Sequence, residues 1–388
     1  MAYEVLARKY RPQTFTEVVG QSHITDTLGR AIDQERIGHA YLFVGSRGTG
    51  KTTMARIFAK CLNCENGPTA NPCNTCSRCK EITAGNSMDV LEIDGASNNK
   101  VEHVREIREN AKFGTNNSLY KIYLIDEVHM LTQGAFNALL KTLEEPPPHV
   151  KFLFATTEPQ KIPDTILSRC QRFDLRRILA KDITGRLQEI CDAEGVEVEE
   201  KALLAVARGA RGGMRDALSA MDQLISFRGK TLREEDVLSV FGLVSQEHLE
   251  KLAAAILKHD VPGILDAIAE FDQTGKDLER VLLDLVIHMR HVLVQAYSPQ
   301  GGLLNELPDI QAAVIREQAE WVDASRVSAL MEKLIGASEQ LKYSLSKRTL
   351  LETSLIAAAR TANFATLDEV WVQVDRLKSG LPEVEKKK

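Results

Sequence analysis

The sequence predicts an α/β domain built on a parallel sheet, followed by a small helical domain and a third, all-helical domain. Two observations lead to this prediction. Over residues 1–177, short apolar segments alternate with amphipathic stretches, which is typical of a doubly wound α/β fold. After residue 177, the strand-like segments give way to amphipathic helices. The length of 388 residues agrees, because it corresponds to two or three domains of ordinary size.

The strands expected in the first domain are short apolar segments bounded by charges or turn residues, as buried parallel strands are. They are residues 41–44, 90–94, 122–126 and 152–156. The helices expected between them are residues 52–62, 101–111 and 133–143. Three consecutive prolines at 146–148 would end the last of these helices.

Residues 178–243 contain no strand-like segment and divide into short helices over 182–191, 201–210, 214–226 and 234–241. Residues 244–365 form longer helices, in which apolar residues share one face. Those predicted to face the core are Leu249, Leu252, Ala253, Ile256, Leu278, Val281, Leu282, Leu285, Val286, Met289, Leu293, Leu330, Met331, Leu334, Ile335, Leu351, Ser354, Leu355 and Ala358. The remaining segment, 366–388, is expected to end in a solvated, flexible tail.

The composition is that of a globular protein, with 44% hydrophobic, 27% charged and only 5% aromatic residues. No run of 18 apolar residues occurs, and no apolar segment follows the basic residues near the start, so neither a membrane span nor a signal peptide is expected. The net charge is −5, an average that still allows one basic face to bind nucleic acid. We therefore expect a protein of the reducing cytoplasm with no membrane partner.

Residues 45–52 match the phosphate-loop pattern G-x-x-x-x-G-K-[ST] between a strand and a helix, which is the context that the pattern requires. Glycines let backbone N–H groups surround phosphates, and the helix N-terminus adds partial positive charge. Lys51 is expected to contact the β- and γ-phosphates, and the Thr52 hydroxyl to bind Mg²⁺. The rest of the predicted phosphate cradle is Gly45, Ser46, Arg47, Gly48, Thr49 and Gly50.

Two carboxylates, Asp126 and Glu127, end the strand predicted at 122–126. Asp126 is expected to bind Mg²⁺, either as a direct ligand or indirectly through a group that is itself a ligand. Glu127 is placed to polarise an attacking water, which indicates hydrolysis as well as binding. Taken alone, the pair would be read as a solvated strand end; beside a complete phosphate loop, the catalytic interpretation is favoured.

Five of the seven cysteines fall between residues 61 and 79. Cys64, Cys73, Cys76 and Cys79 follow the spacing C-x8-C-x2-C-x2-C in a loop rich in glycine, proline and asparagine. Four thiolates suit tetrahedral zinc, and metal binding would supply the order that such a loop lacks. Free thiols and an iron–sulfur cluster are the alternatives. Cys61 ends an apolar helix and is expected to be a buried thiol.

Six further positions are ambiguous from the residues alone. Thr157 could contact the γ-phosphate or the water, although a threonine at a strand end is usually just a cap. By residue type alone, Arg169 and Arg215 are solvated or salt-bridged surface residues, Arg169 then pairing with Asp164 or Asp174. Around the start of the helix at 101–111, three basic residues could follow DNA phosphates. These are Lys100, Arg105 and Arg108, for which the alternative is a solvated face where the arginines pair with Glu102 and Glu109.

Taken together, the motifs resemble those of the AAA+ ATPases, and closely those of bacterial clamp loaders, the gamma/tau family of the DNA polymerase III holoenzyme. The resemblance is strong over residues 1–243 and beyond them rests on helical character and length. The matching segments are LARKYRPQTF (6–15), VVGQ (18–21), the phosphate loop, the cysteine insert, LIDEVHM (124–130), NALLKTLEEP (137–146) and TILSRC (165–170).

The resemblance implies an AAA+ domain over 1–177 with sheet order 5-1-4-3-2 and a zinc insert at 61–80. It implies a lid over 178–243 and a collar over 244–365 that holds a five-subunit ring. Thr157 would sense the γ-phosphate, Arg215 would contact the subunit's own nucleotide, and Arg169 would be an arginine finger for the neighbour's ATP. The residues implied to border the adenine are Arg11, Pro12, Val19 and Gly20.

The implied function is ATP-driven loading of a sliding clamp onto primed DNA at replication forks. The implied partners are further copies of the chain, the delta and delta prime subunits, the sliding clamp and primer–template DNA; the implied cofactors are ATP, Mg²⁺ and Zn²⁺. Two departures stand out: the long polymerase- and helicase-binding extension of tau is not expected from 388 residues, and the basic run before residue 101 is thinned.

Three other functions compete with this one. A branch-migration motor would lack the cysteine insert and the collar. A catalytically silent ring subunit would not need Lys51, Thr52 and Glu127 together. A polymerase active site would need a set of carboxylates that the sequence does not offer.

Overall fold

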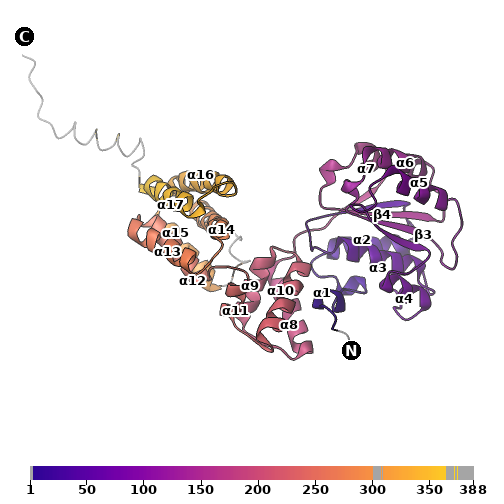
Figure 1. Ribbon diagram of the computed structural model, residues 1–388, viewed down its shortest axis with the longest axis horizontal. Helices are drawn as coiled ribbons and strands as arrows, with labels where there is room; N and C mark the ends of the chain where they lie inside the picture. Colours follow the sequence, from indigo (N-terminus) through magenta and orange to yellow (C-terminus); the bar gives the residue numbers. More distant parts are fainter. Residues whose placement is uncertain (1–2, 300–306, 308, 364–370, 372–373, 375–388) are drawn as a thin grey trace, which may run out of the picture. The chain divides into compact units, whose positions relative to one another are not determined.

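The computed structural model describes residues 3–299, 307, 309–363, 371 and 374, and the chain divides into two compact units, residues 1–237 and 238–388 (Figure 1). Of the C-terminal segment predicted at 366–388, all but Trp371 and Val374 lies outside the described residues. No helix within the described residues combines the length and apolarity that crossing a bilayer requires.

The first unit is built on a five-stranded parallel sheet in the order β2-β3-β4-β1-β5, which confirms the predicted order 5-1-4-3-2. Because the strands are parallel, their carboxyl ends meet at one edge: Val44 pairs with Thr156, and Asp94 with Asp126. The strands are β1 (Ala40–Val44), β2 (Val90–Asp94), β3 (Lys121–Asp126), β4 (Val150–Thr156) and β5 (Gln171–Asp174).

Helices cover both faces of this sheet (Figure 1). Alternate residues of each strand face opposite sides, so Tyr41 and Phe43 pack with α2 and α3 while Leu42 and Val44 pack with α5, α6 and α7. The helices are α1 (Leu6–Lys9), α2 (Ser22–Asp33), α3 (Lys51–Asn63), α4 (Ser77–Ala84), α5 (Val101–Asn110), α6 (Gln133–Glu144) and α7 (Asp164–Leu167). Short 3₁₀ turns occupy Phe15–Glu17, Val128–Met130 and Pro159–Lys161.

The segment after β5 contains the four predicted helices and one feature that the sequence did not predict. A two-residue strand, β6, pairs in parallel with another, β7. The prediction of no strand in this segment was therefore wrong, because two-residue strands are too short to produce a periodic pattern. The elements are α8 (Ala180–Glu194), β6 (Glu197–Val198), α9 (Glu200–Ala210), α10 (Met214–Arg228), β7 (Thr231–Leu232) and α11 (Glu234–Val240).

The described part of the second unit is helical, as predicted, and has one apolar core. The predicted core residues join it with four exceptions: Ile335 is 47% exposed, Ser354 is half-buried and outside the apolar cluster, and Val286 and Leu293 are only partly buried. The helices are α12 (Gln246–Leu257), α13 (Val261–Gln273), α14 (Leu278–Tyr297), α15 (Asp309–Trp321), α16 (Ala324–Leu341) and α17 (Lys347–Asn363).

Candidate nucleotide and metal sites

A pocket of about 150 Å³ lies within the first unit, where the phosphate loop leads from β1 into α3. Gly48 and Gly50 adopt φ of 78° and 104°, a left-handed backbone that favours glycine. Most of the predicted nucleotide-binding residues line this pocket. They are Arg11, Pro12, Val19, Arg47, Gly48, Thr49, Gly50, Lys51, Thr52, Asp126, Glu127 and Arg215.

Lys51 is the lysine of the phosphate loop and lies in the wall of the pocket. Its side chain lies folded into the phosphate loop, where Nζ donates to the carbonyl of Ser46 at 3.1 Å and Thr49 Oγ1 donates to the same oxygen at 2.9 Å. The residue is only 6% exposed. Burial lowers the pKa of Lys51, while the carboxylates of Glu127 and Asp126 act in the opposite direction. An incoming phosphate would therefore meet a poorly hydrated ammonium, which strengthens their attraction.

The two carboxylates at the end of β3 are held in different ways. Thr52 Oγ1 donates to Asp126 Oδ2 at 2.7 Å, which places the two predicted Mg²⁺ residues side by side. The backbone N–H of Glu127 donates to Asp126 Oδ1 at 2.9 Å. Glu127 itself has φ of 43°, so the chain turns sharply here and directs the second carboxylate away from the first.

Glu127 is positioned by residues that follow β3 and β4. Its Oε2 accepts from the N–H and the hydroxyl of Thr157, at 3.1 and 3.0 Å. His129 Nδ1 lies 3.3 Å from the same oxygen and 3.0 Å from Thr156 Oγ1, and the side chain of His129 is 6% exposed. His129 was not among the predicted site residues, although its place two residues after Glu127 was a signal that could have indicated it.

The lid segment contacts the phosphate loop through two glycines. A Cβ on Gly48 would lie 3.0 Å from Cα of Gly213, so a side chain at Gly48 would push the segment away. The N–H of Arg215 donates to the carbonyl of Gly48 at 3.4 Å. Met214 and Leu218 line the pocket beside Arg215, and the sequence analysis missed both, although 214 and 218 share a face of α10.

The opening segment lies across the pocket. Besides the predicted Arg11, Pro12 and Val19, the pocket is lined by Tyr10 and by Ile178. The remaining lining residues, also not predicted, are Glu17, Val18, Thr53 and Arg186. The predicted residues that do not line it are Gly20, Gly45, Ser46, Thr157 and Arg169.

Arg169 follows α7 and points elsewhere. Its guanidinium donates to the carbonyl of Thr165 and to Glu144 Oε1 of α6, both at 2.6 Å. The surface alternative named Asp164 or Asp174 as its partner; the structure gives Glu144 instead, and Asp174 pairs with Arg172 at 2.7 Å. Arg169 thus lies away from the nucleotide pocket of its own chain.

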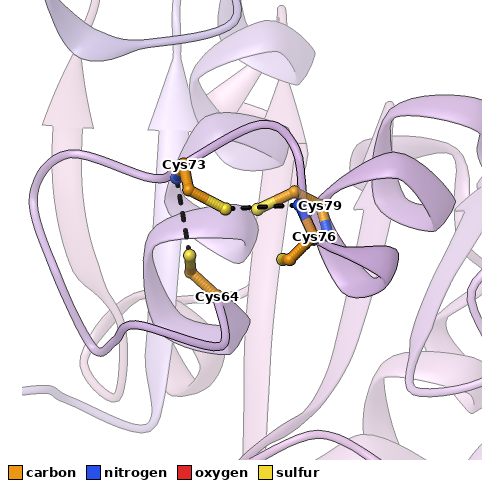
Figure 2. A group of neighbouring side chains, drawn as sticks. All are labelled: Cys64, Cys73, Cys76 and Cys79. Carbon is orange, nitrogen blue, oxygen red and sulfur yellow. Dashed lines mark hydrogen bonds between the residues drawn. The ribbon is translucent and has the colours of Figure 1, made fainter.

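The four predicted metal-binding cysteines come together in one cluster, with every sulfur within 4.8 Å of the others (Figure 2). Cys64 follows the last residue of α3, and Cys76 caps α4 by accepting from the N–H of Cys79 at 3.4 Å. Hydrogen bonding, first from Thr75, lowers the pKa of the Cys73 thiol to about 6, whereas burial raises the pKa of Cys79. Four sulfurs at this spacing fit one tetrahedral ion.

Cys61 does not belong to this cluster. Its thiol is fully buried and donates to the carbonyl of Ala70, at an S···O distance of 3.6 Å. Burial raises the pKa of Cys61, so the residue remains a neutral thiol. This agrees with the prediction of a buried apolar cysteine.

The DNA candidates lie at the start of α5 and along it. Lys100 and Arg105 are exposed, whereas Arg108 is half-buried and donates to Glu109 at 3.2 Å. Among the described residues, no ion pair joins Arg105 to Glu102. Of the two arginines that the alternative pairs with glutamates, only Arg108 has such a partner.

Sequence models of protein families match nearly the whole chain. "DNA polymerase III, delta subunit" matches residues 20–178. "DNA polymerase III clamp loader subunit, ATPase lid domain" matches residues 182–230. "DNA polymerase III subunits gamma and tau domain III" matches residues 232–374. The three matches follow one another along the chain.

Individual relatives agree with the family models. The chain is 46% identical to DNA polymerase III subunit tau of Bacillus subtilis, covering 100% of this chain and 69% of that protein. It is 40% identical to subunit tau of Escherichia coli, covering 92% and 55%. It is 38% identical to subunit gamma of Buchnera aphidicola, covering 92% and 98%. The chain thus spans little more than half of one tau subunit and nearly all of a gamma subunit.

Proposed function

This chain belongs to the gamma/tau family of DNA polymerase III subunits, and on that premise we propose that it is an ATPase that loads a sliding clamp onto primed DNA. One observation carries the proposal: residues 47–52 of the phosphate loop, the carboxylates Asp126 and Glu127, and Arg215 of the lid all line one pocket. A nucleotide bound there would contact a cation, a water-activating carboxylate and a lid residue at once, so binding, hydrolysis and lid position would be linked.

Nucleotide binding follows from the groups that line this pocket. The backbone N–H groups of the phosphate loop and the Lys51 ammonium would hold the phosphates, as the start of α3 favours negative charge. Arg215 would contact the same nucleotide from the lid. Arg11, Pro12, Val19 and Gly20 would border the base.

Hydrolysis would depend on Glu127. Its carboxylate would accept a proton from water attacking the γ-phosphate. Thr52 and Asp126 would hold Mg²⁺, whose charge neutralises phosphate oxygens. Thr157 is the proposed γ-phosphate sensor, and its hydrogen bonds to Glu127 tie that sensor to the proposed base.

The proposed role of Arg169 depends on assembly of a ring. We propose that copies of this chain, with delta and delta prime subunits, form a ring in which Arg169 reaches the ATP of a neighbour. The proposed division is an AAA+ domain (1–177), a lid (178–243) and a collar (244–365). Lys100, Arg105 and Arg108 would follow the template phosphates, and the complex would act on cytoplasmic DNA at replication forks.

We further propose that Cys64, Cys73, Cys76 and Cys79 bind one Zn²⁺. The four clustered sulfurs support a closed site, which has no open position for chemistry. Its proposed role is to order residues 61–80.

The deciding experiment measures ATP hydrolysis by the chain assembled with delta and delta prime, with and without sliding clamp and primed DNA. The proposal predicts that turnover rises when both are present, and that labelled clamp becomes resistant to dissociation from circular primed DNA. ATPase activity that ignores clamp and DNA would contradict clamp loading while leaving the nucleotide site intact.

A further inference from the structure

Lys60 is a buried lysine in the last turn of α3. It is 1% exposed, and its ammonium donates three hydrogen bonds. Two go to Gln13, at 2.8 Å to the carbonyl and 2.7 Å to Oε1, and one goes to Asn74 Oδ1 at 2.7 Å. All three partners are neutral, which is unusual because a buried ammonium normally has a carboxylate partner.

Asn74 belongs to the cysteine loop, lying between Cys73 and Cys76. Burial lowers the pKa of Lys60, while nearby negative charge, from Cys79 when it is ionised and from the carboxylate of Glu17, acts in the opposite direction. A divalent ion on four thiolates leaves net negative charge at this place. A metal-loaded centre would therefore add negative countercharge for Lys60, whose hydrogen-bond partners are neutral.

Gln13 belongs to the segment that borders the nucleotide pocket. Its Nε2 donates to the carbonyl of Arg11 at 2.9 Å, and Arg11 and Pro12 line the pocket. Its Oε1 also accepts from Thr83 of α4 at 3.2 Å. The helix that carries Cys79 thus contacts Gln13 directly through Thr83, whereas the loop that carries Asn74 reaches the same glutamine through Lys60.

The other end of this segment is anchored to the lid. Tyr10 lines the pocket, and its hydroxyl donates to Glu194 of α8 at 2.6 Å. Lys9 donates to the same carboxylate oxygen at 2.6 Å. Residues 10–13, which we call the strap, therefore cross one wall of the pocket between two fixed ends.

We propose that Lys60 is a positioning residue that couples the four-cysteine site to the nucleotide pocket, so that metal binding and nucleotide binding strengthen each other. The proposal rests on the proposed nucleotide site and extends it. Without metal, the loop would lose its order, Asn74 would leave Lys60, and the strap would lose its fixed end at Gln13. Coupling between two binding sites must be reciprocal.

The test uses the full chain and a fluorescent ADP analogue. Removing zinc with a chelator should weaken the affinity for the analogue by about fivefold or more, the lower end of usual couplings. The equilibrium constant for transfer of zinc from the chain to a chromogenic chelator should fall by the same factor when ADP is present. Equal affinity for the analogue with and without zinc would overturn the proposal.

Two variants isolate the link. Lys60→Met removes the ammonium, and the affinity for ADP should then no longer depend on zinc. Asn74→Gly removes only one acceptor and keeps the left-handed backbone (φ 56°) that this position needs. With zinc bound, Asn74→Gly should bind ADP more weakly than the wild type. Lys80→Met is the matched control, because Lys80 is exposed beside Cys79, and it should bind like the wild type.

The outcomes separate the two proposals. The chain could lose its far-UV circular dichroism without zinc, or Lys60→Met could fail to fold. In either case the deciding comparison is between zinc-loaded Asn74→Gly and zinc-loaded Lys80→Met. Equal ADP affinities of these two variants would overturn the coupling. If the zinc-loaded wild type binds no ADP, the proposed nucleotide site fails. Tight binding that is independent of zinc refutes the coupling alone.

Discussion

Three groups meet at one carboxylate oxygen of Glu127: two donate hydrogen bonds to it, and the third, His129, lies within ion-pair distance. The N–H and hydroxyl of Thr157 and the ring of His129 all reach Oε2. Replacing the carboxylate by an amide keeps the size of the side chain but removes its basicity. Glu127 is therefore the residue at which binding and turnover can be separated most cleanly.

Glu127→Gln should bind ATP as the wild type does and hydrolyse it more slowly by about 10²–10⁴-fold, the usual contribution of a general base. Phosphate release and nucleotide titration measure the two quantities. Lys51→Ala should instead lose binding, because the phosphates lose their ammonium partner. Wild-type turnover in Glu127→Gln would show that another group activates the water.

The cysteines allow a similar separation. Cys79→Ser should lose the bound metal, since a hydroxyl replaces one of four thiolates, whereas Cys61→Ala should keep one zinc per chain. Elemental analysis of carefully reduced protein measures both. Iron in place of zinc, or no metal in the wild type, would contradict the proposed site.

Among the secondary-structure elements, the ends of β2 and β3 are packed against each other. A Cβ on Gly95, just after β2, would lie 2.7 Å from the carbonyl oxygen of Glu127 and 2.9 Å from that of Asp126. These atoms belong to the backbone and cannot move aside without shifting the two carboxylates. The close approach of the two strand ends thus fixes the place of the proposed base.

Gly95→Ala should therefore lower both stability, by about 1–3 kcal/mol, and the rate of ATP hydrolysis, while nucleotide affinity changes little. Denaturant unfolding and single-turnover hydrolysis are the measurements. Gly114→Ala is the control, because a Cβ there meets no atom within 4 Å. Equal hydrolysis rates in the two variants would show that the close contact does not position Glu127.

The elements differ in how well the sequence predicts them. The phosphate loop and Asp126–Glu127 were predictable because each is a contiguous motif at the end of an apolar strand. The helix α4 was missed because charged residues interrupt its apolar pattern and Cys76 caps it. The contact of Gly48 with Gly213, and the place of His129, depend on packing between distant segments, which no local pattern contains.

For the whole assembly, the proposed mechanism requires neighbours. Arg169→Ala should still bind ATP but slow its hydrolysis by about 10³–10⁵-fold, the effect of such fingers elsewhere. In rings mixed with Lys51→Ala subunits, the loss should fall on the site next to the variant. Undiminished turnover of Arg169→Ala with clamp and DNA would refute the finger.

The DNA surface is also a property of the ring. Reversing the charge at Lys100 and Arg105 should weaken the stimulation of ATPase activity by primed DNA, because both cations are exposed and would meet phosphates. Activity without DNA should not change. Steady-state assays over a range of salt concentrations measure this, and unchanged stimulation would indicate a merely solvated helix face.

The bond between Arg169 and Glu144 has a thermodynamic consequence. The side chains of the pair are 32% and 50% exposed, and an exposed pair of this kind contributes about 0.2–1 kcal/mol. For Arg169 to bind the phosphate of a neighbouring subunit, the ion pair with Glu144 must break. Breaking this pair would reduce the equilibrium constant for that exchange of partners by about fivefold at most. On the proposed ring mechanism, Glu144 binds the Arg169 guanidinium in the isolated subunit, and this ion pair is too weak to oppose assembly.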